Sequence, residues 1–301
     1  MSESPAPIVI GMGEFLFDEF PDGRRPGGAP ANVAFHANQL GLRGRVCTRV
    51  GRDDDGAALV AHLAQHGVST VLVQHDDRHA TGTVTVHLET NEGPAYTIHE
   101  NVAWDHLAYS DALAAACSEA QAVCFGTLAQ RSAASRRTIG RALDVAAHAL
   151  KVYDVNLRPP HYTPEIIEDS LGRCQVVKLN LDEVGELGAM LGLGSLAPED
   201  FGARVRRDYD VDLVCVTRGG AGCLLVGDTS VDLPGAPVQV VDAVGAGDAF
   251  TAAMTYALLH GWPLARVAAF ANQFGGLVAS RAGAMPHLEQ EVRQLITAAR
   301  A

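Results

Sequence analysis

Residues 242–250, Asp-Ala-Val-Gly-Ala-Gly-Asp-Ala-Phe, place three small residues beside a carboxylate. Gly245, Ala246 and Gly247 have little or no side chain, so their amide N–H groups can approach a ligand closely. At a helix N-terminus, such amides suit a phosphate or a developing negative charge. An anion there would repel Asp248, whose presence makes sense if it takes a proton from an alcohol attacking a phosphate. The alternative is an N-cap aspartate after a glycine-rich turn.

The segments on either side of this motif predict a strand-to-helix junction. Residues 237–241 form an extended apolar run that predicts a strand. Residues 249–260 predict a helix, which Gly261 and Pro263 end.

A second glycine-rich turn lies near the N-terminus, at residues 26–32. The amides of Gly27 and Gly28 can approach a polyol, and Asn32 offers both a donor and an acceptor to hydroxyl groups. The same residues also fit a tight turn followed by an N-cap. Asp18 lies on a predicted strand, where it can bind paired sugar hydroxyls or simply be exposed at the strand end.

Three later segments place polar residues directly after apolar strands, where open α/β sheets bind ligands. Asn180 and Glu183 share a first helical turn, in which they can hold a hydrated Mg²⁺ or form a capping box. Arg158 can bind a phosphate through two hydrogen bonds or be a surface arginine. The turn at residues 217–222 can hold a phosphate or close a hairpin.

The composition excludes several kinds of partner. The 301 residues suffice for one large α/β domain with a small appendage. A formal charge of −12 argues against nucleic acid or an anionic membrane. No signal-peptide pattern and no run of roughly 20 apolar residues occurs, so we expect a cytoplasmic protein. The six cysteines lack metal-ligand spacing and lie mostly in apolar runs, which predicts reduced, buried thiols.

Apolar strands alternate with helices along most of the chain, which predicts a parallel sheet covered on both faces. Residues 81–88 and 95–99 instead alternate polar and apolar side chains around a turn at 90–94, which predicts a small antiparallel sheet that residues 14–20 can join. The other predicted strands are 8–11, 45–50, 122–125, 151–155, 176–179 and 213–217. The other predicted helices are 32–40, 56–66, 136–150 and 182–191.

Two common nucleotide-binding signatures are absent from the sequence. The P-loop needs a lysine after glycine, and neither Lys151 nor Lys178 follows one. The Rossmann fingerprint needs a third glycine, where Leu16 and Phe250 stand in the two candidate segments. If this protein binds ATP, it does so through a different binding motif.

Together, the motifs resemble those of the ribokinase (PfkB) carbohydrate kinase family, in order and spacing, over essentially the whole chain. They are Gly-Gly-x-x-x-Asn, Asn-x-x-Glu, Thr-x-Gly-x-x-Gly and Asp-x-x-Gly-Ala-Gly-Asp-x-Phe, of which the last is highly specific. Within the family, the segments 13–18, 100–105 and 154–158 look most like bacterial fructokinases.

The resemblance implies a role for each matching residue. Asp248 matches the general base that deprotonates a terminal hydroxymethyl group, and residues 245–247 match the anion hole. Sugar contacts are implied at Asp18, Gly27, Gly28, Asn32 and Arg158. The Mg²⁺-ATP motif corresponds to Asn180 and Glu183, and further ATP-binding positions are Thr217, Gly219, Gly222 and Asn272.

The resemblance also implies a monovalent-cation loop, at Asp242, Val244, Val278 and Gly283. His287 stands where potassium-binding members often carry Ser or Thr. This departure argues against potassium activation, and K⁺ is kept as an alternative.

The implied fold is a ribokinase-like three-layer α/β sandwich, with a central mostly parallel sheet and a small β-sheet lid. The expected core comprises residues 1–13, 33–78 and 107–301, and the expected lid comprises 14–32 and 79–106. Lids of this family often pair between subunits, so we expect a homodimer.

The implied activity is ATP- and Mg²⁺-dependent phosphorylation of a sugar, with D-fructose giving fructose 6-phosphate. The alternatives are a kinase for 2-keto-3-deoxygluconate, ribose or a nucleoside. A more distant alternative is a sugar-sensing protein without catalysis.

Overall fold

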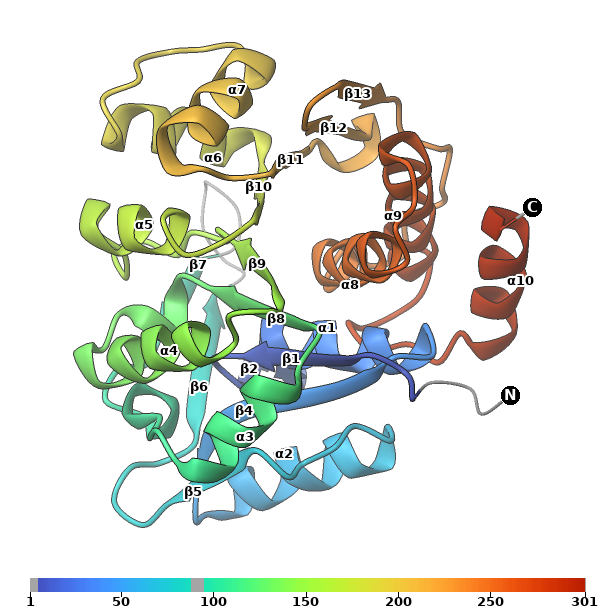
Figure 1. Ribbon diagram of the computed structural model, residues 1–301. Coiled ribbons are helices and arrows are strands. Elements are labelled where there is room, and N and C mark those ends of the chain that lie inside the picture. The colour runs from blue at the N-terminus through green and yellow to red at the C-terminus, as the bar shows by residue number, and fades with distance from the viewer. Residues whose placement is uncertain (1–4, 88–94, 301) are drawn as a thin grey trace.

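The computed structural model describes residues 5–87 and 95–300, which fold into one large sheet and one small sheet with helices around them (Figure 1). In the large sheet, the strands from β5 to β11 in spatial order are parallel to one another. At one end, β12 pairs antiparallel with β11, and β13 pairs antiparallel with β12. Its strands are, in spatial order, β13 (Ser230–Leu233), β12 (Cys223–Val226), β11 (Leu213–Thr217), β10 (Val176–Asn180), β9 (Leu150–Asp154), β8 (Ala122–Gly126), β1 (Ile8–Met12), β4 (Arg43–Gly51) and β5 (Val73–Asp76).

Helices cover both faces of the large sheet, because its strands alternate apolar side chains between the two faces. In β1, Ile8, Ile10 and Met12 join one buried cluster, and Val9 joins another on the opposite face. The first cluster packs against α3 (Asp111–Glu119), α4 (Ala133–Val145), α5 (Pro164–Leu171), α6 (Leu181–Met190) and α7 (Pro198–Tyr209). The second packs against α1 (Ala29–Gln39), α8 (Ala246–Leu259), α9 (Leu264–Ala279) and α10 (Glu289–Arg300), while α2 (Asp54–Gln65) packs near β4. These layers confirm the predicted ribokinase-like fold class.

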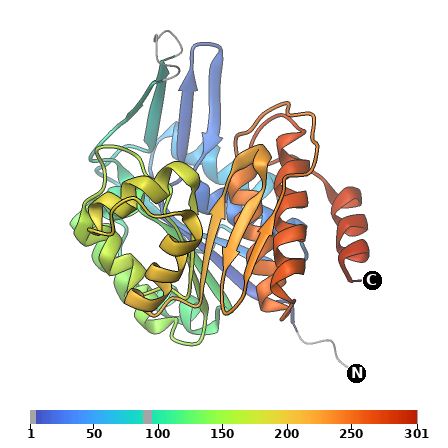
Figure 2. The ribbon, with the colours of Figure 1, turned by 90° about the horizontal axis from the view of Figure 1, so that it is seen from above.

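The small sheet projects from the rest of the molecule (Figure 2). Its strands are, in order, β3 (Gly23–Gly27), β2 (Leu16–Phe20), β6 (Gly82–His87) and β7 (Ala95–Ile98). The antiparallel pairing of β6 with β7 and the addition of β2 agree with the predicted small sheet. The sheet is not wholly antiparallel as predicted, because β2 pairs with β6 in parallel. The predicted turn at 90–94 lies outside the described residues.

The predicted strand at residues 237–241 is wrong. These residues form an irregular segment between β13 and α8, and Val240 and Val241 are each 62% exposed. An apolar run becomes a strand only where a neighbouring strand supplies hydrogen bonds, and here β13 is the end strand of the sheet.

Several helix boundaries also differ from the prediction, and α8 begins three residues before its expected start. Helix α1 begins at Ala29, three residues before the expected start, with Pro30 in its first turn, a position that tolerates proline. Helix α4 begins at Ala133, three residues before the expected start, and ends at Val145, because Leu150 already pairs in β9.

All six cysteines are buried and free, as predicted. Among the described residues, no helix is both long enough and apolar enough to cross a membrane.

Candidate active site

Asp248 lies in the first turn of α8 and is hydrogen-bonded to a residue far away in the chain. The Nδ2 of Asn32, in the first turn of α1, donates to its Oδ2 at 2.6 Å. The Oδ1 of Asn32 is buried and has no hydrogen-bond partner among the described residues. Since Asn32 lines a cavity, this free acceptor suits a ligand hydroxyl group.

The surroundings of Asp248 raise the pKa of its carboxyl group to about 7. Desolvation is the main cause, and the negative charge of Asp154 adds to it. The hydrogen bond from Asn32 and the charge of Lys178 oppose the rise. A carboxylate with a pKa near neutrality can accept a proton efficiently.

A buried charge network lies close to Asp248. The ammonium of Lys178 is 3.1 and 3.2 Å from the two carboxylate oxygens of Asp154. The hydroxyl of Thr251, one turn after Asp248 on α8, donates to Asp154 at 3.1 Å. Burial lowers the pKa of Lys178, but the surrounding carboxylates, led by Asp154, raise it by more than burial lowers it. The pKa therefore lies above its usual value, and the ammonium stays charged.

The glycines that precede Asp248 permit two close approaches. Gly245 has a φ of +77°, and a Cβ there would lie 2.6 Å from the Cα of Ala284. A Cβ at Gly247 would lie 3.2 Å from the Nζ of Lys178. The amides of Gly245 and Gly247 at the start of α8 and the Lys178 ammonium therefore form a positive region beside Asp248, whereas the amide of Ala246 donates to the oxygen of Ala243 at 3.3 Å.

A cavity of about 620 Å³ opens onto this region. Residues of the small sheet form one side, and the ends of β1, β9 and β10 with the first turns of α1 and α8 form the other. Five expected sugar contacts line it, namely Asp18, Gly27, Gly28, Asn32 and Arg158. The structure therefore brings these residues together with Asp248.

Asp18 and Gly27 are neighbours in the small sheet. A Cβ at position 27 would lie 2.2 Å from the Oδ2 of Asp18, so glycine is required for the carboxylate to lie there. Burial raises the pKa of Asp18 to about 6, although the nearby charge of Arg158 counteracts this rise.

Asn180 and Glu183 form the capping box that the sequence left as an alternative. Asn180 Oδ1 accepts from the amide of Glu183 at 2.9 Å, and Glu183 Oε2 accepts from the amide of Asn180 at 2.7 Å. Glu183 Oε1 also accepts from the amide of Leu157, which lines the cavity. Glu183 thus lies directly behind the cavity wall.

The other expected nucleotide positions gather near the end of β13. Residues 217–222 form a hairpin turn between β11 and β12, as one of the two interpretations predicts. A Cβ at Gly222 would lie 2.1 Å from the oxygen of Leu233, and Asn272 donates to the oxygen of Pro234 at 3.3 Å. The Thr217 hydroxyl donates to Leu179, and Gly219 begins the turn itself.

The expected cation loop is held together by hydrogen bonds. Asp242 accepts from the amides of Val244 and Gly283, each at 3.0 Å. His287 packs its ring against His66, with ring centroids 4.8 Å apart. Val278 is buried in α9. Each carboxylate oxygen of Asp242 binds one backbone amide, so the protein's own hydrogen bonds hold this loop together.

Sequence reasoning missed two charged residues of the cavity. Lys178 lies inside a buried apolar strand and is one of only two lysines, a signal that could have identified it. Glu14 is buried, and its Oε2 has no hydrogen-bond partner among the described residues. Burial raises the pKa of Glu14.

The two sheets and the cavity between them define a ribokinase-like α/β protein. Residues 22–291 match the model of the pfkB family carbohydrate kinases, and the chain belongs to this family.

Relatives of this family resemble the chain over nearly its whole length. A fructokinase from Klebsiella pneumoniae is 31% identical over 298 residues, which cover 92% of this chain and 94% of the relative. A sugar kinase from Pyrococcus horikoshii, solved in complex with ATP, is 27% identical with a TM-score of 0.81 and covers 96% of this chain and 99% of its own. A fructokinase from Xylella fastidiosa with bound ATP shares the fold, with 23% identity, a TM-score of 0.85 and coverage of 98% and 99%.

Proposed function

We propose that this carbohydrate kinase transfers the γ-phosphoryl group of ATP to the terminal hydroxymethyl group of D-fructose, with Asp248 as the general base. The observation that carries the proposal is the carboxyl group of Asp248, with a pKa of about 7, beside open helix amides and the Lys178 ammonium. A carboxyl group of this pKa is about half ionised at neutral pH, and its carboxylate form accepts a proton more readily than an ordinary aspartate.

The residues of the cavity divide the reaction between them. The sugar hydroxyl gives its proton to Asp248 while its oxygen bonds to the γ-phosphorus, and the bond from phosphorus to the ADP oxygen breaks. The amides of residues 245–247 and the Lys178 ammonium stabilise negative charge on the transferred group. Asn32 holds the carboxylate in place, and its free Oδ1 accepts from a sugar hydroxyl.

ATP is supported as the co-substrate by the relative solved with ATP and by the surface beyond the cavity. Val240 and Val241 expose apolar side chains, which a nucleotide base can cover. We place ATP across residues 217–222 and Asn272, next to this segment.

Mg²⁺ supplies charge neutralisation on the phosphates when it is bound. Asn180 and Glu183 fit a water-mediated role, because a carboxylate has about four lone-pair positions and the capping box uses only some of them. Among the described residues, no group of three or more His, Cys, Asp or Glu side chains is arranged to hold a metal by itself. A Mg²⁺ that arrives with ATP needs only one or two protein carboxylates.

Fructose is favoured because the Klebsiella relative is a fructokinase. An acidic sugar such as 2-keto-3-deoxygluconate is the second candidate, since two arginines, Arg25 and Arg158, line the cavity. A coupled ADP-release assay with fructose, 2-keto-3-deoxygluconate, ribose, glucose, mannose and adenosine separates these substrates. Turnover led by fructose supports the proposal, and turnover led by another compound replaces the substrate. No turnover across the panel, with and without potassium, points to a substrate outside the panel or to a sugar-sensing protein.

Asp248→Asn tests the general base. We expect kcat to fall by more than about 10²-fold while the affinities for ATP and sugar are retained. The matched control is Asp182→Asn, an exposed carboxylate in the first turn of α6, which should keep normal turnover. Near-normal kcat in Asp248→Asn would show that the base assignment is wrong.

The small sheet supports a lid function for segments 14–32 and 79–106. A lid excludes water, which would otherwise hydrolyse ATP. Residues 29–32 lie in α1, so the moving part ends at Gly28. The six buried, free thiols support a reducing compartment, and we place the enzyme in the cytoplasm.

A further inference from the structure

A second cavity, of about 460 Å³, lies where the small sheet is joined to the core. It shares no lining residue with the candidate active site. Residues 77–81 lead from β5 into β6 on one side, and residues 99–109 return from β7 on the other. One face of α4 closes the cavity, whose volume is typical of small-molecule sites.

The cavity is strongly basic in a chain with a net charge of −12. Four arginines line it, Arg49, Arg78, Arg137 and Arg141, with Asp76 as the single carboxylate. Asp76 is already used: it lies 2.7 Å from Arg49 Nε and accepts from the amides of Arg78 and His79. Burial alone would raise its pKa, but these contacts hold the pKa below the usual range.

The other three guanidinium groups have no such partner. Within residues 5–87 and 95–300, no carboxylate lies within 4.0 Å of Arg78, Arg137 or Arg141. Arg137 and Arg141 are one turn apart on α4, where like charges repel. The guanidinium of Arg141 is held 3.8 Å above the centroid of the Tyr109 ring. Arg141 is therefore held in place by an aromatic ring without being neutralised by a carboxylate.

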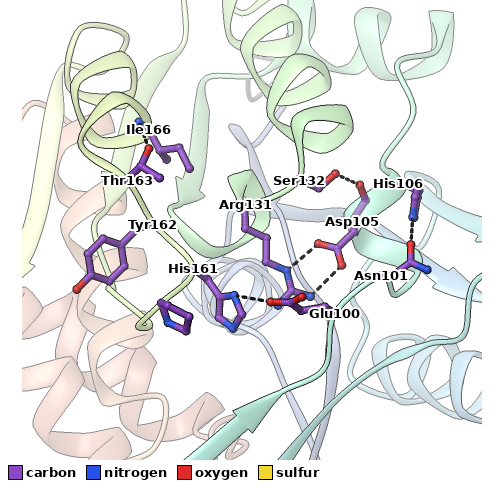
Figure 3. Close-up of a pocket in the computed structure, with 11 residues that line it drawn as sticks. Glu100, Asn101, Asp105, His106, Arg131, Ser132, His161, Tyr162, Thr163 and Ile166 are labelled. Carbon is purple, nitrogen blue, oxygen red and sulfur yellow. Dashed lines mark hydrogen bonds and ion pairs between the residues drawn. The ribbon is translucent and has the colours of Figure 1, made fainter.

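The two joining segments meet at a pair of stacked imidazoles. His79 and His106 have ring centroids 3.6 Å apart and an interplanar angle of 12°. His79 binds Asp76, and His106 binds Asn101 at 3.0 Å. Figure 3 shows the neighbouring pocket, in which Arg131 binds Asp105 and anchors the returning segment to the core.

We propose that this cavity binds a small phosphorylated anion with two or more negative charges, and that the bound anion holds the two joining segments against α4. Guanidinium groups bind phosphate oxygens through paired hydrogen bonds, and three unpaired arginines match a multiply charged group. The anion connects Arg78, on the segment entering the small sheet, with Arg137 and Arg141 on the core. It therefore regulates the position of the small sheet from outside the active site.

Calorimetric titration with inorganic pyrophosphate tests this site. We expect Arg137→Gln/Arg141→Gln to bind pyrophosphate at least about tenfold more weakly than the wild type. The matched control, Arg43→Gln/Arg45→Gln, removes the same charge from two other arginines and should bind normally. Equal binding by the wild type and the Arg137/Arg141 variant would place pyrophosphate elsewhere and overturn the proposal. Equal losses in both double variants would show general electrostatic attraction and also overturn it.

Hydrogen exchange gives a second readout. Pyrophosphate should slow amide exchange in residues 77–81 and 99–109 of the wild type, since an anion that joins these segments to α4 opposes their opening. The Arg137→Gln/Arg141→Gln variant should show no such slowing. Unchanged amide exchange in the wild type would contradict the proposal that the anion holds the two joining segments against α4. Neither the titration nor the exchange measurement depends on kinase activity. The outcomes of both are therefore independent of the proposed function.

Discussion

Asp248 combines two properties that a general base needs, a raised pKa and a fixed orientation. Burial and Asp154 favour the protonated form, while Asn32 and Lys178 favour the carboxylate. The balance sets a pKa of about 7 at a residue whose named neighbours come from three different elements, α1, β9 and β10. Changing one neighbour should therefore move the pKa in a known direction.

The pH profile of the reaction tests this balance. Because the base works only as a carboxylate, we expect kcat/KM to rise with pH through about 7 and to level off above it. Asn32→Ala removes a hydrogen bond that lowers the pKa of Asp248, so the rise should shift to higher pH. The profile of kcat/KM from pH 5 to 9 gives the position of the rise, whatever the effect of Asn32 on sugar affinity.

Asn38→Ala is the control, since Asn38 lies on the same helix and binds Gly67 and Gly44 instead. Its profile should match that of the wild type. A rise at lower pH in Asn32→Ala would contradict the assigned role of Asn32.

At the scale of the element, the N-terminus of α8 depends on glycine for its shape. Gly245→Ala adds a Cβ at φ +77° and against Ala284, so the amides of the anion hole must shift. We expect kcat to fall on the order of 10²-fold or more, as for the loss of an oxyanion donor. Steady-state kinetics with saturating sugar and ATP measure this loss.

Gly261, beyond the other end of α8, supplies the comparison. Its φ is +65°, but a Cβ there meets open space. Gly261→Ala should lower the free energy of unfolding by about 1 kcal/mol and leave kcat unchanged. Equal kcat values in the two variants would show that the geometry at Gly245 does not matter for the reaction.

The loop before α8 leads to a prediction about potassium. Asp242 already ties Val244 to Gly283 across the loop, so an ion is not needed to hold it. We expect turnover to change by less than about twofold when K⁺ is replaced by tetramethylammonium at constant ionic strength. A large stimulation by K⁺ alone would contradict this prediction. Asp242→Asn should lower turnover in both salts, because it weakens the same two contacts.

The elements show what local sequence can and cannot predict. Apolar runs such as residues 176–179 and 213–217 became strands, because each lies between two neighbours in the sheet. Residues 237–241 have a similar composition but no partner strand, and local sequence does not contain that information. The capping box at Asn180 was predictable because both of its bonds span only three residues.

At the scale of the whole molecule, the site depends on contacts between distant parts of the chain. The motifs identified Asp248 and Asn32 separately, but their hydrogen bond joins residues 216 positions apart. The salt bridge between Lys178 and Asp154 joins two adjacent strands, β10 and β9, and the motifs did not identify Lys178. Spacing along the sequence predicts which residues carry chemistry, whereas the sheet order determines which of them meet.

The small sheet is also where we expect two subunits of a homodimer to meet. It has only four strands, and its outer strands β3 and β7 each pair on one side among the described residues. Such edges readily pair with another chain. Tyr96 on β7 is 57% exposed, although it lines the active-site cavity. A partner subunit that covers this edge would complete the cover over the sugar.

We therefore expect light scattering to give a dimer, at twice the chain mass of 31.7 kDa. Tyr96→Glu should shift the population towards monomer on dilution, because it places a charge at the edge that the partner covers. Val71→Glu is the control, since Val71 is 68% exposed but lies between α2 and β5, away from the small sheet. A single wild-type species at monomer mass would rule the dimer out. A dimer that both variants leave intact would place the contact elsewhere.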